Sequence, residues 1–361
     1  MPKHATLTLH GDPYTMGRQH GQQVRNLRPQ IVEAIDARFR QLKEDGPDAR
    51  FESLVQDTRA LLEIGDTRLL DMIRGQAEAL AFDFDTLLRY DLIAFLRDDL
   101  LVRHALDAEG CTTWVASGSA TAGGEPILAK NRDYRPDHLP LQHVVRAMPD
   151  TGYPYLYVSS AGSPGVFSAG INQAGLAVAD THVYSTDLGP GLPSFALMMH
   201  ILEGHDRVSS ALEYLRAVPR LGRNNLILTD AMGHLAVFEC GHTRYGLIER
   251  HDGSLVNTNH FSSDDMRDCF AAVGPPQARG RSLGRYETVS RALAGAQGSV
   301  DVAFAQRLAA EHDGPLGSIC CHPTADTNST TISASIFLPR QRQMYFCHGL
   351  PCQGSYDEFS F

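Results

Sequence analysis

The first third of the chain places its hydrophobic residues at helical spacing. Ile31, Ile35 and Phe39 recur along the segment and would form the apolar face of one helix. The same spacing returns at residues 69–77 and again at residues 87–96. The pattern therefore predicts a mostly helical region that ends shortly before residue 111.

The pattern changes at Cys111, where β-branched and aromatic residues begin to dominate. The run CTTWVAS, the glycine-rich segment SATAGGEP and the run ILAKN together predict a hairpin of two strands. Further strands are predicted at residues 143–148, 155–160, 166–171, 175–183, 225–230, 234–240, 254–259, 331–338 and 343–347, and helices at about 194–204, 207–217, 282–296 and 301–311. Because the strands come in groups rather than alternating with helices, we expect an α+β fold. We expect two regions, a helical one at 1–110 and a strand-rich one at 111–361.

Composition narrows the class of protein. The 361 residues are 43% hydrophobic and 20% charged, which is typical of a globular chain. A net charge of −10 disfavours nucleic acid and anionic membrane as partners. We find no signal peptide and no apolar run of about 18 residues, so we expect a cytoplasmic protein without a membrane segment. Seven cysteines are too few for a disulfide scaffold in a chain of this length.

The junction at Gly110 and Cys111 draws attention because a thiol begins a strand directly after a glycine. A cysteine in such a place is most often a small buried hydrophobic residue. A second interpretation rests on the neighbours. Glycine leaves its own carbonyl open to attack, and Asp107 and Glu109 make the preceding segment polar. The hairpin would also return the triplet Asn-Arg-Asp (131–133) to the side of Cys111.

Cleavage between Gly110 and Cys111 would give Cys111 a free α-amino group beside its thiol. An α-amine has an ordinary pKa of roughly 7.7–8.0 and can act as a general base near neutral pH. Thiol and base would then belong to one residue. The chain could make this cut itself. The thiol would attack the Gly110 carbonyl and form a thioester by an N-to-S acyl shift, and water would then hydrolyse the thioester.

Five motifs along the chain strengthen this second interpretation. In order, they are GCTTW (110–114), NRD (131–133), SAGINQAGLAVA (168–179), VNTNHF (256–261) and SIC (318–320). The set resembles the penicillin acyltransferase-like peptidases, which include the fungal acyl-coenzyme A:6-aminopenicillanic acid acyltransferase and belong to the N-terminal-nucleophile hydrolases. The segment GDPYTMGRQHG (11–21) also resembles the opening segment of that family.

The resemblance implies a four-layer αββα sandwich, self-cleavage before the cysteine, and a prosegment (1–110) that stays bound as a small subunit. It implies that Cys111 is the nucleophile, that Asp133 orients the nucleophile region, and that Asn259 supplies the oxyanion-hole amide. A turn-forming role remains the alternative for both Asp133 and Asn259. Residues expected to contact the substrate, or else to be structural, are Asn131, Arg132, Tyr134, His182, His260 and Phe261.

The expected reaction is hydrolysis or acyl transfer on a small N-acyl amide or acyl-thioester, with a thioester acyl-enzyme. An acceptor amine would be a second partner if the acyl group is transferred. No cofactor is implied. One position departs from the family: relatives commonly carry arginine after SIC, whereas this chain has Cys321. A contact to an anionic part of the substrate would be lost there, so we expect a substrate other than penicillin precursors.

Three alternatives remain open. Cys320, Cys321, His322, Cys347, His348 and Cys352 could form a zinc site, but the spacing contains no close C-x2-C pair, and we expect no metal. A cysteine–histidine pair could act without self-cleavage, although its cysteine would normally begin a helix, where the dipole lowers the thiol pKa. Finally, the chain could be a non-catalytic binding protein on a degenerate hydrolase fold.

Overall fold

The computed structural model describes residues 6–44, 49–96, 110–271, 276–323 and 329–361. The N-terminal region is helical, as predicted, but it opens with a short strand that the sequence pattern did not reveal. Its elements are β1 (Leu7–Gly11), α1 (Pro13–Gln23), α2 (Arg28–Glu44), α3 (Ala49–Gly65), α4 (Arg68–Leu80) and α5 (Phe84–Leu96). Strand β1 pairs in parallel with β4 (Gln142–Pro149), so the N-terminal region takes part in a sheet.

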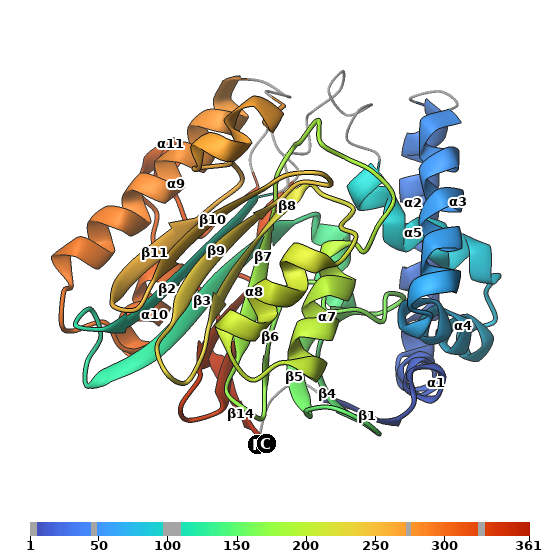
Figure 1. The fold of residues 1–361 in the computed structure, drawn as a ribbon, viewed down its shortest axis with the longest axis horizontal. Coiled ribbons are helices and arrows are strands. Elements are labelled where there is room, and N and C mark those ends of the chain that lie inside the picture. The colour runs from blue at the N-terminus through green and yellow to red at the C-terminus, as the bar shows by residue number, and fades with distance from the viewer. Residues whose placement is uncertain (1–5, 45–48, 97–109, 272–275, 324–328) are drawn as a thin grey trace.

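Two sheets form the centre of the molecule (Figure 1). The first has eight strands in the order β1-β4-β5-β6-β7-β8-β9-β10, and the second has six in the order β11-β2-β3-β12-β13-β14. The remaining strands of the first sheet are β5 (Tyr155–Ser160), β6 (Ala169–Asn172), β7 (Ala177–His182), β8 (Asn224–Thr229), β9 (Leu235–Cys240) and β10 (Tyr245–Arg250). Those of the second are β11 (Gly253–Asn257), β2 (Gly110–Gly118), β3 (Gly124–Tyr134), β12 (Thr330–Leu338), β13 (Gln343–His348) and β14 (Tyr356–Ser360).

Helices cover the outer face of each sheet, which gives four layers. The helices that pack on the eight-stranded sheet are α1 to α5, α7 (Ser194–Gly204) and α8 (Val208–Ala217). Those on the six-stranded sheet are α9 (Pro276–Gly295) and α10 (Val302–Ala309), followed by the short α11 (Gly314–Gly317). Between the sheets, Val115 and Leu128 pack against Val158 and Ile227 in a separate apolar cluster. The αββα sandwich implied by the sequence is therefore confirmed.

The predicted hairpin is the pair β2 and β3, and its register positions the chemistry. Gly110 lies opposite Asp133 and Cys111 lies opposite Arg132. Successive side chains of a strand point to opposite faces, and directly opposed residues share a face. Val115 faces the other sheet. Cys111 and Arg132 therefore share the inter-sheet face, while Asp133 shares the face covered by α9 and α10.

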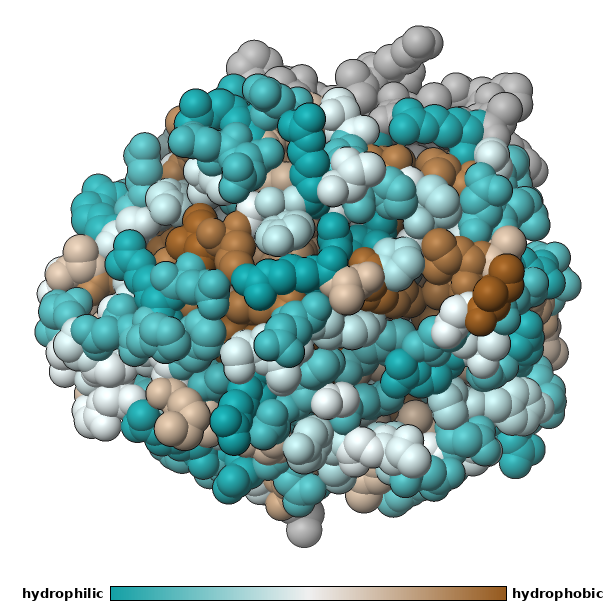
Figure 2. Space-filling model, viewed as in Figure 1, coloured by the Kyte–Doolittle hydropathy of each residue, from teal (hydrophilic) through white to brown (hydrophobic). Residues whose placement is uncertain are grey.

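The visible surface in Figure 2 is mostly polar, with hydrophobic side chains gathered in two patches, one over the strands and one near the N-terminal helices. Among the residues that the structure describes, six large hydrophobic residues are exposed, of which Ile64 and Met232 are the most exposed. None of the helices among the described residues is long and apolar enough to cross a bilayer.

Candidate active site

The backbone of Cys111 is held from both sides by side chains. Its N–H donates to Asn259 Oδ1 at 2.9 Å, and its carbonyl accepts from Arg285 Nη1 at 2.6 Å. Cys111 itself is buried, as the second residue of β2. The structure thus brings Cys111 and Asn259 together although they lie 148 residues apart in the sequence. Before, only the resemblance to a family linked the two residues.

The orientation of the Asn259 amide follows from its neighbours. A guanidinium can only donate hydrogen bonds, and Arg285 Nη2 lies 2.8 Å from Asn259 Oδ1, so that atom is the oxygen. The amide nitrogen then donates to the carbonyl of His182 at 2.9 Å. The amide oxygen of Asn259 is therefore engaged by two donors, whereas its nitrogen uses one of its two N–H groups on the His182 carbonyl. The second N–H could donate to an oxyanion while the bond to His182 is kept.

Asp133 lies beside the backbone of Gly110, on the face of β2 and β3 opposite the thiol of Cys111. Its Oδ1 accepts from Thr331 Oγ1 at 2.6 Å, and its Oδ2 lies 3.9 Å from Arg285 Nη1. Burial raises the pKa of Asp133 to about 6, against the lowering effect of Arg285 and Thr331. A Cβ at Gly110 would come within 2.9 Å of Asp133 Oδ2, so glycine is required there for the carboxylate to approach the backbone.

Arg285 is the residue that sequence reasoning missed. It lies on α9, is 6% exposed, and also donates to Thr112 Oγ1 at 2.9 Å. It therefore ties together the carbonyl of Cys111, the amide of Asn259 and the carboxylate of Asp133. No sequence signal marks it, because α9 carries several arginines and only the packing of α9 on β2 selects this one.

The thiol of Cys111 lies among charged side chains of both signs. Burial raises its pKa above the ordinary value; Asp180 and Asp133 raise it further, and Lys130 and Arg132 lower it. Lys130 is itself buried and paired with Asp180 Oδ1 at 2.6 Å.

The triplet Asn131-Arg132-Asp133 divides between the two faces of the sheet. Asn131 is buried on the helix-covered side, where its amide donates to the carbonyls of Ala309 at 2.8 Å and Ile319 at 3.0 Å. The structure does not bring it to the thiol. Arg132, on the thiol's face, donates to Gln142 Oε1 at 3.3 Å and stacks over the Tyr134 ring at 5.3 Å.

The remaining predicted residues lie around the asparagine. His182 offers its carbonyl to Asn259, and its ring packs edge-on against Tyr184 at 5.4 Å between centroids. His260 is hydrogen-bonded through Nδ1 to Ser282 Oγ at 2.9 Å, and burial lowers its pKa to about 4. Phe261 packs edge-on against Phe270. The ring of His260 therefore stays neutral near pH 7 and has a structural contact of its own.

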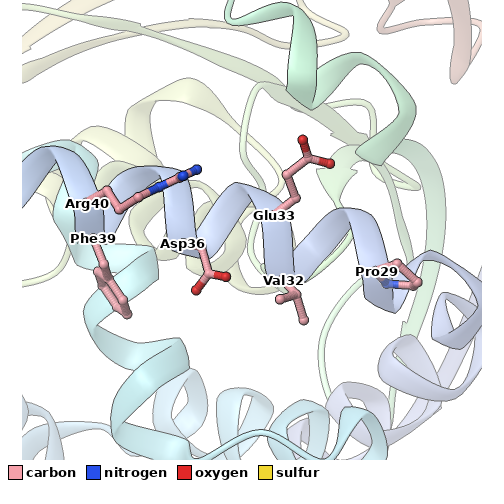
Figure 3. Close-up of a pocket in the computed structure, with 6 residues that line it drawn as sticks. All are labelled: Pro29, Val32, Glu33, Asp36, Phe39 and Arg40. Atoms are coloured by element: carbon pink, nitrogen blue, oxygen red, sulfur yellow. The ribbon is translucent and has the colours of Figure 1, made fainter.

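A small cavity of about 30 Å³ lies beside Arg132, between the N-terminal helices and the sheets. Its polar lining includes Arg38 from α2 and Tyr134 from β3, and Phe167 supplies an apolar wall. A larger hollow of about 440 Å³ is lined by residues of a single helix, α2 (Figure 3). Among the described residues, neither lining includes Cys111, and the smaller cavity is far below the roughly 300–1,000 Å³ of small-molecule sites. The smaller cavity is of interest because the two buried arginines Arg38 and Arg132 meet there, and Arg132 lies opposite Cys111.

Cys321 is joined to the same corner of the molecule. Its N–H donates to Thr331 Oγ1 at 2.7 Å, and Thr331 in turn donates to Asp133. Burial raises the pKa of Cys321 to about 11, while Arg285 and Arg281 lower it. Two arginines of α9, Arg285 and Arg281, therefore act electrostatically on position 321.

Comparisons with known proteins agree with this picture. The sequence profile of the family described as acyl-coenzyme A:6-aminopenicillanic acid acyl-transferase matches residues 120–353. The match includes Asp133, Asn259 and Arg285 but begins after Cys111. No curated protein sequence matches the chain.

Solved structures similar to this chain include those of a hydrolase and of an acylase. Two mutant forms of conjugated bile acid hydrolase from Clostridium perfringens are 12% and 13% identical, with a TM-score of 0.47 over 70% of this chain and 97% of theirs. Penicillin V acylase from Agrobacterium tumefaciens is 17% identical, with a TM-score of 0.43 over 66% of this chain and 83% of its own. These scores are too low to support any argument about activity.

Proposed function

Since the chain belongs to the acyl-coenzyme A:6-aminopenicillanic acid acyl-transferase family, we propose that it is a self-processing amidohydrolase or acyltransferase with Cys111 as its N-terminal nucleophile. One observation carries the proposal. Asn259 accepts from the N–H of Cys111 and Arg285 donates to its carbonyl, so the backbone directly after Gly110 is held from both sides. After cleavage, the α-amine of Cys111 would lie at this held position and could act as the base for its own thiol, whose pKa burial raises.

Processing would begin when the Cys111 sulfur attacks the carbonyl carbon of Gly110. The C–N bond breaks, a thioester forms between Gly110 and the sulfur, and the released nitrogen takes up a proton. Water then hydrolyses the thioester, which leaves a carboxylate on Gly110 and restores the thiol. The buried Asp133 beside Gly110 and the guanidinium of Arg285 on the Cys111 carbonyl are placed to hold this backbone during the step.

Turnover would repeat this chemistry on an external acyl group. The α-amine accepts the thiol proton as the sulfur attacks a substrate carbonyl, and then returns it to the leaving amine or thiol. Asn259 Nδ2 would donate its second N–H to the oxyanion while its first stays on the His182 carbonyl. One well-placed amide donor of this kind contributes roughly 3–4 kcal/mol to the transition state. Water or an acceptor amine completes the cycle by attacking the thioester.

The cavity beside Arg132 suggests the substrate class. Arg38 and Arg132 are both buried, and both line it. Guanidinium groups bind carboxylates through two parallel hydrogen bonds. We therefore favour a small N-acyl compound with a carboxylate, such as an N-acyl amino acid, over an uncharged amide. Such a compound is larger than the cavity of about 30 Å³, so the cavity would have to widen to bind it. Because Arg38 belongs to α2, the N-terminal region would have to stay in place after cleavage.

Retention of residues 1–110 as a bound small subunit has a physical basis. Strand β1 pairs with β4 along its five residues. Leu9, Met16 and Ile31 are fully buried in the same cluster as Phe195 and Phe238 of the larger region. Loss of this region would expose a large apolar area, at a cost of roughly 25 cal/mol per Å².

Intact mass of the purified protein tests the processing step. We expect wild type to give two masses that correspond to residues 1–110 and 111–361, and Cys111→Ala to give one uncut mass. Cys269→Ser, which alters a thiol outside the site, should be cut as wild type is. An active but uncut wild-type chain would overturn the proposal.

The reaction itself is tested by incubating processed protein with N-acyl amino acids, N-acyl amines and acyl-thioesters, with and without an acceptor amine. Mass spectrometry of the products separates hydrolysis from transfer. We expect turnover of at least one amide by wild type and none by Cys111→Ala. Turnover that survives this substitution would remove Cys111 from the role of nucleophile.

A further inference from the structure

Four potential metal ligands converge at a site distinct from Cys111. They are His312, Cys320, His322 and Cys352. His312 follows α10, Cys320 and His322 precede β12, and Cys352 lies in the turn after β13. Their ligand atoms all lie within 4.8 Å of one another. Three separate parts of the chain thus bring two thiols and two imidazoles to one point.

The distances match a tetrahedral set of zinc ligands. His322 Nε2 lies 3.8 Å from Cys320 Sγ and 3.3 Å from Cys352 Sγ. With Zn–S of about 2.3 Å and Zn–N of about 2.0–2.1 Å, a sulfur and a nitrogen on a tetrahedral zinc are about 3.6 Å apart. The two observed distances fall on either side of this value. Small side-chain adjustments are enough to seat an ion.

The backbone around the cluster is already ordered for binding. The N–H groups of Ile319 and Cys320 both donate to the carbonyl of Glu311 at 3.0 Å, which ties Cys320 to the residue before His312. The rings of His312 and His322 lie 5.1 Å apart and are tilted by 50°, so they are not stacked on each other. Cys320 is fully buried, whereas His312 and Cys352 are exposed, so an ion could enter from solvent.

We propose that His312, Cys320, His322 and Cys352 bind one zinc ion in a structural site. Two cysteines and two histidines are a ligand set that zinc prefers, and four protein ligands leave no open position for a substrate. On binding, both thiols lose their protons to solvent and the imidazoles bind as neutral groups. No electron is transferred in this step.

The ion would stabilise the wall next to the candidate active site. Cys321 lies between two of the ligands and is bonded through Thr331 to Asp133. The amide of Asn131 also holds the carbonyl of Ile319, next to Cys320. Zinc would therefore join the end of α10 and the turn after β13 to the strand ends that carry Asp133.

The sequence pattern concealed this site for two reasons. His312 lies outside the cysteine-rich stretches that suggested a metal. Among the residues considered from sequence, Cys321, Cys347 and His348 do not belong to the cluster. Cys321 instead lies near the carbonyls of His322 and Ser329, and His348 Nε2 donates to the carbonyl of Leu139 at 2.9 Å.

Metal analysis of the full-length protein, produced with added zinc and then dialysed, tests the proposal. We expect about one zinc per chain in wild type and far less in Cys352→Ser and in His312→Ala. Cys269→Ser and His251→Ala, which change a thiol and an exposed imidazole elsewhere, should keep their zinc. Substoichiometric zinc in wild type, or full zinc in both ligand variants, would overturn the proposal.

Two further measurements distinguish the proposal from other outcomes. Cobalt(II) bound in place of zinc should give the thiolate-to-cobalt absorption band of a tetrahedral site, and this band should be missing in Cys352→Ser. Thiol counting on the unreduced protein should find Cys320 and Cys352 reduced; a disulfide between them would overturn the proposal. Cys111→Ala should bind zinc as wild type does, so a failure of the proposed activity leaves this test intact.

Discussion

The two faces of the β2–β3 hairpin differ, although neighbouring residues of the same two strands supply both. The inter-sheet face carries Cys111 and Arg132, beside a cavity. The face under α9 and α10 carries Asn131 and Asp133, both buried and hydrogen-bonded. A triplet that looks like one motif therefore provides one candidate substrate contact and two supports. The difference teaches that strand alternation, rather than nearness in sequence, separates the side chain on the face of Cys111 from those that support the backbone.

Substitution of Arg285 should have the largest effect of any change on the face under α9 and α10. Arg285→Met removes the hydrogen bonds to the Cys111 carbonyl and the Asn259 amide, so we expect kcat/KM of the processed protein to fall roughly 10²–10³-fold. Steady-state kinetics and the fraction of cleaved chain measure the effect. Arg291→Met, which removes an exposed arginine of the same helix, is the matched control and should remain near wild type. Near-normal processing and activity in Arg285→Met would contradict a supporting role for the helix-covered face.

Asp133 tests the same face through the pH dependence of stability. Its pKa of about 6 in the folded protein lies above the ordinary value of 3.8, so the folded chain binds the proton more tightly than the unfolded chain does. The neutral carboxyl therefore stabilises the fold at low pH, and this stabilisation is lost as pH rises from about 4 to above 6. Relative to its parent, Asp133→Asn should therefore gain on the order of 3 kcal/mol in the free energy of unfolding as pH rises from 4 to 7.

Urea unfolding at each pH measures this difference, with both proteins carrying Cys111→Ala so that neither is cut. Asp252→Asn is the control of opposite sign. Hydrogen bonds from Ser119 lower the pKa of the exposed Asp252, so its carboxylate stabilises the fold at higher pH and loses that effect in acid. A stability difference for Asp133→Asn that does not change with pH would contradict the assignment.

Asn131 and Arg132 sharpen the comparison with two adjacent residues. Asn131→Ala leaves the buried carbonyls of Ala309 and Ile319 without a donor, at a cost of about 1–3 kcal/mol in the free energy of unfolding. We expect little change in KM. Arg132→Met should do the reverse and raise KM about tenfold for a carboxylate substrate, with a small effect on stability. The same effect from both substitutions would mean that the two faces are not functionally distinct.

Much of the fold follows from periodicity along the sequence. Helices α2, α4 and α5 and most strands after Cys111 lie where the pattern predicts them, because each buries one face in an apolar cluster. The pattern did not single out helices α1 and α3, and it missed strands β1, β10 and β14. All three strands lie at the edge of a sheet, where a strand needs no long alternating pattern.

The sequence by itself determined the candidate nucleophile region. Gly110, Cys111 and the later asparagine and aspartate could be recognised because their residue types and order are local properties of the chain. Tertiary structure alone decided which of them meet and on which face. Arg285 reaches Cys111 across 174 residues, and His312 joins cysteines from two other segments. Such contacts depend on how helices and turns pack on the sheets, and no spacing along the chain encodes that packing.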